Sequence, residues 1–252
     1  MNDYTIANEY TLPSEGKVYD HEISTQFKLR SMTTVEEMKR LNHSEKPNRA
    51  ICEIIDDCLV EDIGISAYDL CTADFQYMLH KLRIVTYGPE YKLGSRCPWC
   101  GSDNTHVVHL ESDLLLKPLD MNEFMKYSEF ELPVTKHKIK LNMQTPRMMD
   151  DAKVASKELL RREPNFVGDP SVLVTLELMI DTIDGEVPPR FKLRPFIEKL
   201  PMRDTNFILK SALKLNNLFG LESGLNHTCS RCGLDYTGNF RTTSEFFGPS
   251  ID

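Results

Sequence analysis

Four of the seven cysteines form two tight pairs, and a glycine directly follows each pair. A Cys-x-x-Cys turn lets two thiolates approach one ion from a short loop, and the glycine permits the backbone conformation that aims amide N–H groups at sulfur. Four thiolates form the tetrahedral set that Zn²⁺ prefers in closed structural sites, which leave no position open for a substrate. The sequence therefore predicts one structural Zn²⁺ bound by Cys97, Cys100, Cys229 and Cys232.

The distance between the two pairs along the chain is unusual. Ordinary zinc ribbons place roughly 15 to 20 residues between the pairs, whereas residues 101–228, which number 128, separate Cys100 from Cys229. Two arrangements fit this spacing. In the favoured one the pairs meet at one ion; in the other, each pair recruits a further ligand from the neighbouring His106, His109 or His227.

Other roles for these cysteines fit less well. A redox pair of the thioredoxin type requires an exposed first cysteine at a helix N-terminus, but glycine and polar residues follow both pairs. Cys52, Cys58 and Cys71 stand alone in apolar surroundings and are expected to be reduced packing residues. Trp99, the only tryptophan, lies between the first two cysteines and is expected either to anchor a partner or to pack over the metal site.

Composition limits the classes of protein to which the chain can belong. The chain has 252 residues, 40% hydrophobic content and a net charge of −8, and this acidic balance argues against duplex DNA as the main partner. The sequence lacks an apolar run of about 18 residues, and Met1–Tyr10 lacks the basic and apolar regions of a signal peptide. A cytoplasmic protein is expected, in which structural disulfides are rare.

Apolar periodicity and turn residues predict helices mixed with short strands, which is an α+β fold. In the first half, a strand pair ends near Leu29, Thr33 or Thr34 is expected to cap a helix, Pro47 to open a second helix and Thr72 to cap a third. Gly88 and Pro89 end the third helix, and strands at 91–96 and 105–110 flank the first cysteine pair. The second half is expected to contain a strand at 139–143, a helix at 146–162, a helix favoured at 172–183 and a short element at 191–200. A helix capped by Asp204 follows, with Phe207, Leu209, Leu213 and Leu218 on its apolar face, and then a lead-in at 221–228.

The two halves repeat one another. A shift of 132 positions without a gap superimposes seven identical residues within one helix–glycine–strand–cysteine unit, which predicts an internal duplication. We expect an N-terminal repeat at 1–118 and a C-terminal repeat at 119–252, joined by a split zinc ribbon. The identities are Phe75/Phe207, Gly88/Gly220, Glu90/Glu222, Leu93/Leu225, Cys97/Cys229, Cys100/Cys232 and Gly101/Gly233.

The chain resembles a family of baseplate proteins of T-even-type bacteriophages. The resemblance covers nearly the whole sequence, although a charged or polar residue is expected where Trp99 stands. It rests on the following segments: LPSEGKVY at 12–19, KLRSMTTVEE at 28–37, YGPEY at 87–91, CPWCG at 97–101, IDTIDG at 180–185, LPMRD at 200–204, CSRCG at 229–233 and FFGPS at 246–250.

This resemblance implies a non-enzymatic late protein of a contractile-tailed bacteriophage. It implies a role in baseplate hub formation, as a hub subunit or an assembly factor, with other baseplate or tail proteins as partners. It places the chain in the host cytoplasm during assembly, or in the virion tail. The Leu-Pro turns at 12–13 and 132–133 and the segment 245–250 are candidate interaction surfaces. A zinc-ribbon regulator that binds nucleic acid and an enzyme with a structural zinc are the alternatives, but no catalytic motif is apparent.

Overall fold

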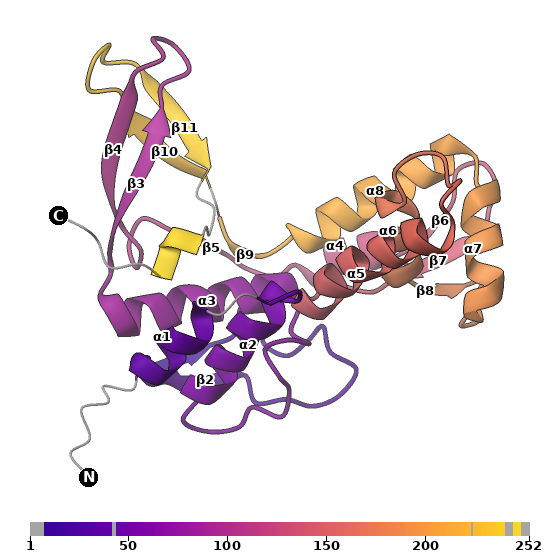
Figure 1. Cartoon of the computed structure of the whole chain (residues 1–252), viewed down its shortest axis with the longest axis horizontal. Coiled ribbons are helices and arrows are strands. Elements are labelled where there is room, and N and C mark those ends of the chain that lie inside the picture. Colours follow the sequence, from indigo (N-terminus) through magenta and orange to yellow (C-terminus); the bar gives the residue numbers. More distant parts are fainter. Residues whose placement is uncertain (1–7, 42–43, 223, 240–243, 248–252) are drawn as a thin grey trace.

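The computed structural model describes residues 8–41, 44–222, 224–239 and 244–247. The chain forms two helical lobes that lie side by side and an arm of two β-hairpins that stands on the first lobe (Figure 1). We call residues 8–87 the first lobe, residues 121–216 the second lobe, and the hairpins within 90–109 and 224–239 the arm. Helices alternate with small antiparallel sheets throughout, which confirms the predicted α+β class.

The first lobe packs three helices against one strand pair. Thr33 caps α1 in a capping box with Glu36, Pro47 opens α2, and Gly88, at φ +87°, ends α3, so these predicted helix ends are confirmed. Thr72 was expected to cap α3, but it is the first residue of the helix, and Cys71 occupies the N-cap position. The three solitary cysteines are buried, as expected. The elements are β1 (Asn8–Thr11), β2 (Gln26–Leu29), α1 (Thr34–Arg40), α2 (Pro47–Cys58) and α3 (Thr72–Tyr87).

The second lobe has a separate hydrophobic core around a three-stranded sheet in the order β6-β7-β8. Buried residues from the sheet and from α6, α7 and α8 fill this core. The elements are α4 (Met121–Ser128), β6 (Glu129–Glu131), β7 (Lys138–Leu141), α5 (Pro146–Arg162), α6 (Ser171–Met179), β8 (Ile180–Ile183), α7 (Arg190–Lys199) and α8 (Met202–Asn216).

Two expectations for the second lobe were wrong. The segment 172–183 is not one helix, because Ile180–Ile183 leaves α6 and pairs with β7 as the edge strand β8. Asp204 does not cap α8, which begins two residues earlier. The buried apolar face of α8 consists of Ile208, Ala212 and Leu215. Of the apolar residues predicted for this helix, Phe207 and Leu213 are exposed, whereas Leu209 is partly buried and Leu218, beyond the end of the helix, is buried.

Both lobes hold a Leu-Pro turn against the first turn of a helix by the same type of contact. In the first lobe, the buried Asp74 of α3 accepts hydrogen bonds from the backbone N–H of Ser14, at 2.9 Å, and from its hydroxyl. In the second lobe, the buried Asp204 of α8 accepts hydrogen bonds from the N–H groups of Val134 and Thr135, both at 2.9 Å. Each aspartate is the third residue of its helix.

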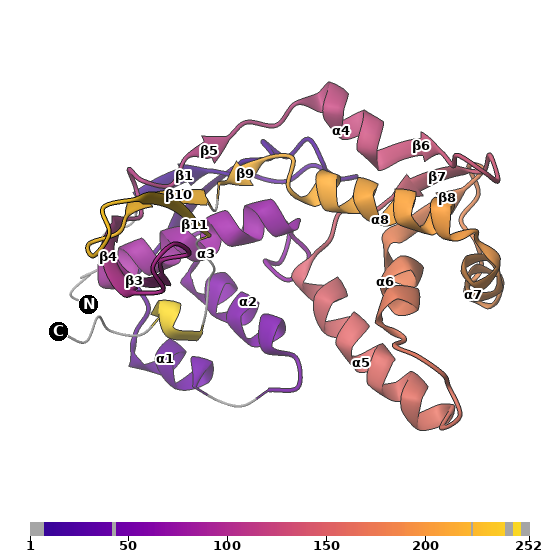
Figure 2. The same cartoon turned by 90° about the horizontal axis from the view of Figure 1, so that it is seen from above.

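The arm carries both cysteine pairs at its far end. Its first hairpin continues from α3, and its second follows α8, so the arm combines strands from both ends of the chain (Figures 1 and 2). A short strand pair and the C-terminal 3-10 helix connect the arm to the lobes. The elements are β3 (Glu90–Arg96), β4 (Asp103–His109), β5 (Leu116–Lys117), β9 (Gly220–Leu221), β10 (Gly224–Thr228), β11 (Asp235–Asn239) and η1 (Ser244–Phe247).

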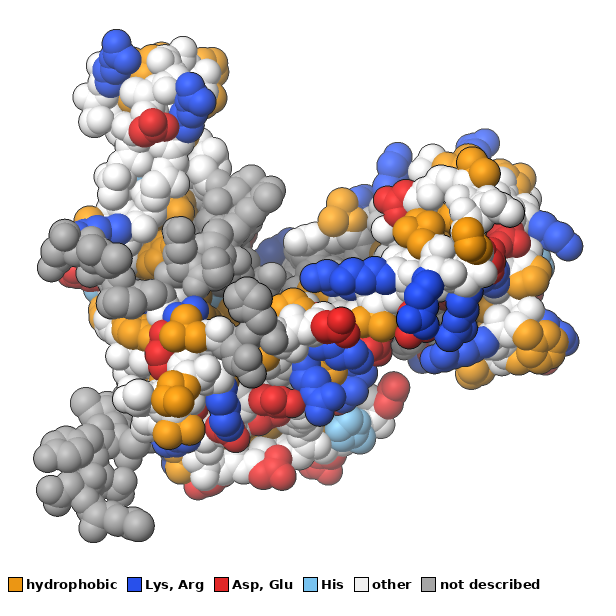
Figure 3. Space-filling model, in the orientation of Figure 1, with side chains coloured by type: hydrophobic (Ala, Val, Ile, Leu, Met, Phe, Trp, Pro, Cys, Tyr) orange, Lys and Arg blue, Asp and Glu red, His pale blue; other side chains and the backbone are white. Residues whose placement is uncertain are grey.

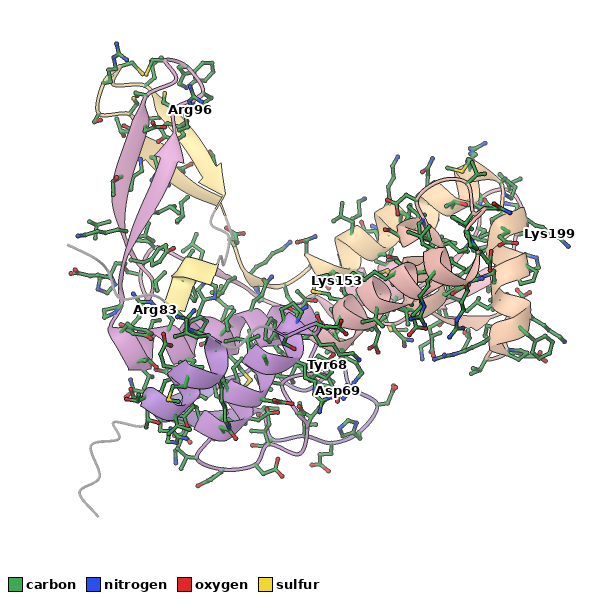
Figure 4. All side chains as sticks on the ribbon, in the orientation of Figure 1. Tyr68, Asp69, Arg83, Arg96, Lys153 and Lys199 are labelled. Atoms are coloured by element: carbon green, nitrogen blue, oxygen red, sulfur yellow. The ribbon has the colours of Figure 1, made fainter. Side chains whose placement is uncertain are left out.

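The two lobes also contact each other directly, far from the cysteines. The N–H and hydroxyl of Thr72 both donate to the backbone oxygen of Gln144. Arg147 pairs with Asp69 at 2.7 Å, and Figure 4 shows that Asp69 lies where the two lobes meet. Asp150 of α5 is 1% exposed and accepts hydrogen bonds at the N-terminus of α2. The halves are therefore joined at the base of the molecule as well as at the tip of the arm.

Candidate metal centre

The two Cys-x-x-Cys turns have the same local geometry. In each turn the glycine N–H donates to the first cysteine oxygen, at 3.0 Å for Gly101 and 2.9 Å for Gly233. Both glycines have a positive φ, +70° and +71°, a region that a residue with a Cβ rarely adopts. The glycine that follows each pair is thus required by the turn, as the sequence indicated.

The four sulfur atoms converge at the tip of the arm, although the chain brings them from 128 residues apart. The Sγ atoms of Cys97 and Cys232 lie 3.8 Å apart, those of Cys100 and Cys229 lie 3.6 Å apart, and all four lie within 4.8 Å of one another. Sulfurs bound tetrahedrally at about 2.3 Å from Zn²⁺ are separated by about 3.8 Å. The four cysteines are therefore close enough to hold one metal ion.

Polar groups beside two of the sulfurs, those of Cys100 and Cys229, favour the thiolate form, which is the form that binds metal, whereas desolvation and contacts with the other sulfurs raise the pKa of the Cys232 thiol. The Ser102 hydroxyl lies 3.1 Å from Cys100 Sγ and 3.3 Å from Cys229 Sγ. Hydrogen bonding to Ser102 lowers the pKa of the Cys229 thiol to about 5 and also lowers the pKa of the Cys100 thiol. Ser102 was not singled out from the sequence, because the second turn has Leu234 at the matching position.

Asn104 joins the two turns and was also missed by sequence analysis. It is 6% exposed, and its side-chain oxygen accepts hydrogen bonds from the Ser230 N–H, at 3.0 Å, and from the Ser230 hydroxyl, at 2.8 Å. Its amide nitrogen lies 3.7 Å from Cys229 Sγ. Groups that contact metal ligands fix the orientation of those ligands, and Asn104 does so across the two hairpins.

The histidines considered as alternative ligands lie below the sulfur cluster and do not join it. His106 and His227 stack on each other with their ring centroids 4.0 Å apart, and His106 contacts the Tyr236 hydroxyl at 3.0 Å. Within the described ranges, the group whose ligand atoms lie close enough to share a metal ion consists of the four cysteines. The geometry therefore matches the favoured arrangement, in which the two pairs meet.

Trp99 projects from the first turn into solvent and does not pack over the sulfurs. Its side chain is 65% exposed, and its indole N–H donates to the backbone oxygen of Asp235 across the two hairpins at 3.1 Å. Leu234 in the second turn is 52% exposed. Both basic and acidic side chains lie near this tip (Figure 3).

A closed four-cysteine cluster at the junction of two hairpins is typical of a structural metal centre in an α+β protein. The chain matches the family described as T4 bacteriophage base plate protein over residues 4–248, and it therefore belongs to that family. Membership gives the chain a structural or assembly role in the phage tail baseplate, in contact with other phage structural proteins. Searches of curated proteins and of solved structures found no match.

No helix of the described residues is long and apolar enough to cross a membrane. The family is a structural one, and its model matches nearly the full chain. The expected phage relationship is thus confirmed at the level of the baseplate family.

Proposed function

We propose that the chain is a non-enzymatic tail morphogenesis protein that acts in assembly of the baseplate hub, as a hub subunit or as an assembly factor. Family membership over nearly the whole chain carries this proposal. The chain would act in the host cytoplasm during assembly, and a hub subunit would remain in the tail baseplate of the virion. Its partners would be other baseplate or tail proteins.

We further propose that the metal is Zn²⁺ and that it is structural. Four thiolates suit zinc, and they leave no coordination position for water or substrate. Cys97 and Cys100 would supply two ligands from the first hairpin, and Cys229 and Cys232 two from the second. Bound there, the ion would fix the hairpins against each other and would hold Trp99 in place as an anchor for a partner.

The internal duplication, with repeats at 1–118 and 119–252, is part of the same proposal. Three features recur in the two halves: a Leu-Pro turn held by an aspartate at the third helical position, a glycine with positive φ after that helix, and a hairpin that ends in a Cys-x-x-Cys turn. A split ribbon formed from two copies accounts for the long separation of the cysteine pairs.

Removal of the chain from an infection tests the assembly role. A phage whose gene carries an early stop codon should accumulate particles without functional baseplates in a host that does not suppress the codon. Normal particle yield under these conditions would rule out the role. Mass spectrometry of mature particles then separates the two forms of the proposal, since a hub subunit is present at a fixed copy number and an assembly factor is absent.

The alternative function is that of a zinc-ribbon regulator that binds nucleic acid. A zinc-ribbon regulator would bind duplex DNA with an affinity that falls steeply with salt concentration. The net charge of −8 and the mixed charges at the tip of the arm favour a protein partner instead (Figure 3).

A further inference from the structure

The two hairpins of the arm leave a groove between β4 and β10. It has a volume of about 580 Å³, and eleven residues line it. β4 pairs only with β3, and β10 only with β11, among the strands of the described residues. The lining residues are Thr105, His106, Val107, Val108, Asp113 and Leu115 on one side, and Gly224, Leu225, Asn226, His227 and Thr228 on the other.

The register of each hairpin shows which backbone groups point toward the groove. Cys229 N–H donates to the Leu234 oxygen, so this residue pair is hydrogen-bonded within its ladder. Because residues of an antiparallel strand point their N–H and C=O alternately toward and away from the partner strand, those of Gly224, Asn226 and Thr228 point away from β11.

The same rule applies to β4. Cys97 N–H donates to the Ser102 oxygen, so the backbone groups of Thr105, Val107 and His109 point away from β3. The His109 N–H confirms this direction, since it donates to the Asp113 carboxylate at 2.8 Å and not to β3. Both strands thus direct donors and acceptors away from their own hairpin partners.

The residues of these two edges also lack the usual protection against strand addition. Natural sheets protect exposed edges with charged residues, especially lysine, or with proline. β10 contains neither a charged residue nor a proline, and β4 contains a single charged residue, Asp103, at its far end. The opposite strand β3, by contrast, carries Glu90, Lys92 and Arg96.

We propose that an extended segment of a partner tail protein adds as a further strand to the edge of β10, in the groove between β10 and β4. This inference rests on the proposed assembly role and names the mode of binding. Five residues of β10 line the groove, so the segment needs about five residues, or roughly 16 Å of extended chain. Backbone hydrogen bonds would supply affinity, and alternate side chains specificity.

The side chains of the groove define the chemistry of the segment. Val107 and Leu115 are each 64% exposed, and they offer apolar contact to alternate residues of the added strand. Asp113 is the acidic residue of the lining, and the N–H of His109 lowers the pKa of its carboxyl group, so it is ionised. The segment should therefore combine β-branched or other apolar residues with a basic residue opposite Asp113.

A matched pair of proline variants tests this mode of binding. Asn226 of β10 faces Thr237 of β11 in the ladder, both are exposed, and the backbone N–H of each points away from the other strand. Asn226→Pro removes a donor on the groove side, while Thr237→Pro removes the equivalent donor on the opposite edge of the same hairpin. Both changes remove the same hydrogen bond between the Thr237 hydroxyl and Asn226.

The variants are supplied from a plasmid to cells infected by the stop-codon phage. Asn226→Pro should lower particle yield by about tenfold or more, whereas Thr237→Pro should support yields close to wild type. Val107→Pro, on the other wall of the groove, should also lower the yield and decides the test if Asn226→Pro fails to fold. Zinc content and circular dichroism of the purified variants establish that they fold.

Wild-type yields from folded Asn226→Pro and Val107→Pro would overturn the proposed strand addition. Equal loss from Asn226→Pro and Thr237→Pro would also overturn it, since the loss would then not depend on the groove. If the proposed assembly role itself were wrong, the result would be distinguishable, because the stop-codon phage would then yield normal particles without any plasmid.

Discussion

At the residue scale, two of the four cysteines proposed to bind the metal, Cys100 and Cys229, have neighbours that lower the pKa of their thiols, while the pKa of the Cys232 thiol is raised by desolvation and by its contacts with the other sulfurs. Ser102 contacts two of the sulfurs, and Asn104 ties the first hairpin to the second turn. The solitary Cys52, Cys58 and Cys71 differ in environment, because burial raises their thiol pKa values. Geometry therefore separates the two sets of cysteines, because only Cys97, Cys100, Cys229 and Cys232 converge on one point among the described residues.

Substitution of one ligand should therefore abolish metal binding, while substitution of a solitary cysteine should not. Cys229→Ser is expected to reduce bound zinc from about one per chain to near zero, because three thiolates and an alcohol hold the ion far more weakly. Cys58→Ser is the matched control, since Cys58 is also buried but lies in α2. Elemental analysis of the purified proteins measures the difference. Retention of zinc by Cys229→Ser would contradict the assignment of ligands.

At the element scale, α3 organises the first lobe, and the C-terminal η1 completes its core. Arg83 of α3 is fully buried, and its guanidinium donates to the backbone oxygens of Phe246, at 2.8 Å, and of Gly88, at 3.0 Å. Phe246 and Phe247 are 0% and 5% exposed, and the ring of Phe246 packs against His80 and Tyr91. Within the segment 245–250, which was expected to be an interaction surface, Phe246 and Phe247 therefore dock on this chain; residues 248–250 of that segment lie outside the described residues.

Removal of the Phe246 ring should destabilise the first lobe. Phe246→Ala is expected to lower the free energy of unfolding by about 3 kcal/mol or more, because it empties a fully buried aromatic site. Phe191→Ala is the control, since Phe191 is 75% exposed at the start of α7, and should change stability by less than about 0.5 kcal/mol. Denaturant titration measures both. An unchanged unfolding midpoint for Phe246→Ala would show that η1 does not contribute to the core.

The docked position of η1 also changes how deletion of residues 245–252 must be interpreted. Such a deletion removes core residues along with any contact to a partner, so a loss of assembly after deletion would not by itself identify an interaction surface. Exposed positions on the arm are better suited to that purpose.

At the scale of the whole molecule, the sulfur cluster at the tip of the arm is one of several connections between the halves. The others include the pairing of β5 with β9, the docking of η1 on α3, and the contacts of α2 and α3 with α5 and with the loop that precedes it. The lobes lie beside each other at the base, while the arm stands away from both (Figure 1). A metal ion bound by the cysteines would therefore be one of several links between the halves.

Removal of the metal should loosen the arm and leave the lobes in place. Trp99 is the only tryptophan and lies in the first cysteine turn, so its fluorescence reports on the arm alone. A chelator should shift or quench the emission of Trp99, while far-ultraviolet circular dichroism should change little, because the helices belong to the lobes. Collapse of the helical signal on chelation would show that the metal supports the whole fold.

Much of the fold follows from local sequence signals. The capping box at Thr33, the prolines at the starts of α2 and α5, and Gly88 after α3 fix helix ends through contacts within a few residues. The secondary structure of the apolar segment 172–183 was not predictable in this way, because its last four residues form strand β8 only by pairing with the edge of β7. The role of Asp204 likewise depends on a turn 69 and 70 residues away in sequence.

The sequence by itself determined the α+β class, the cysteines that form the cluster and the likeness to the baseplate family, since residue types and short spacings encode all three. The tertiary structure alone decided that the two cysteine pairs meet, that Trp99 faces solvent and that β4 and β10 border a groove. The physical reason is the separation of the contacting residues along the chain. Caps and turns involve neighbouring residues, whereas a shared ion or a groove depends on how strands that are distant in sequence pack.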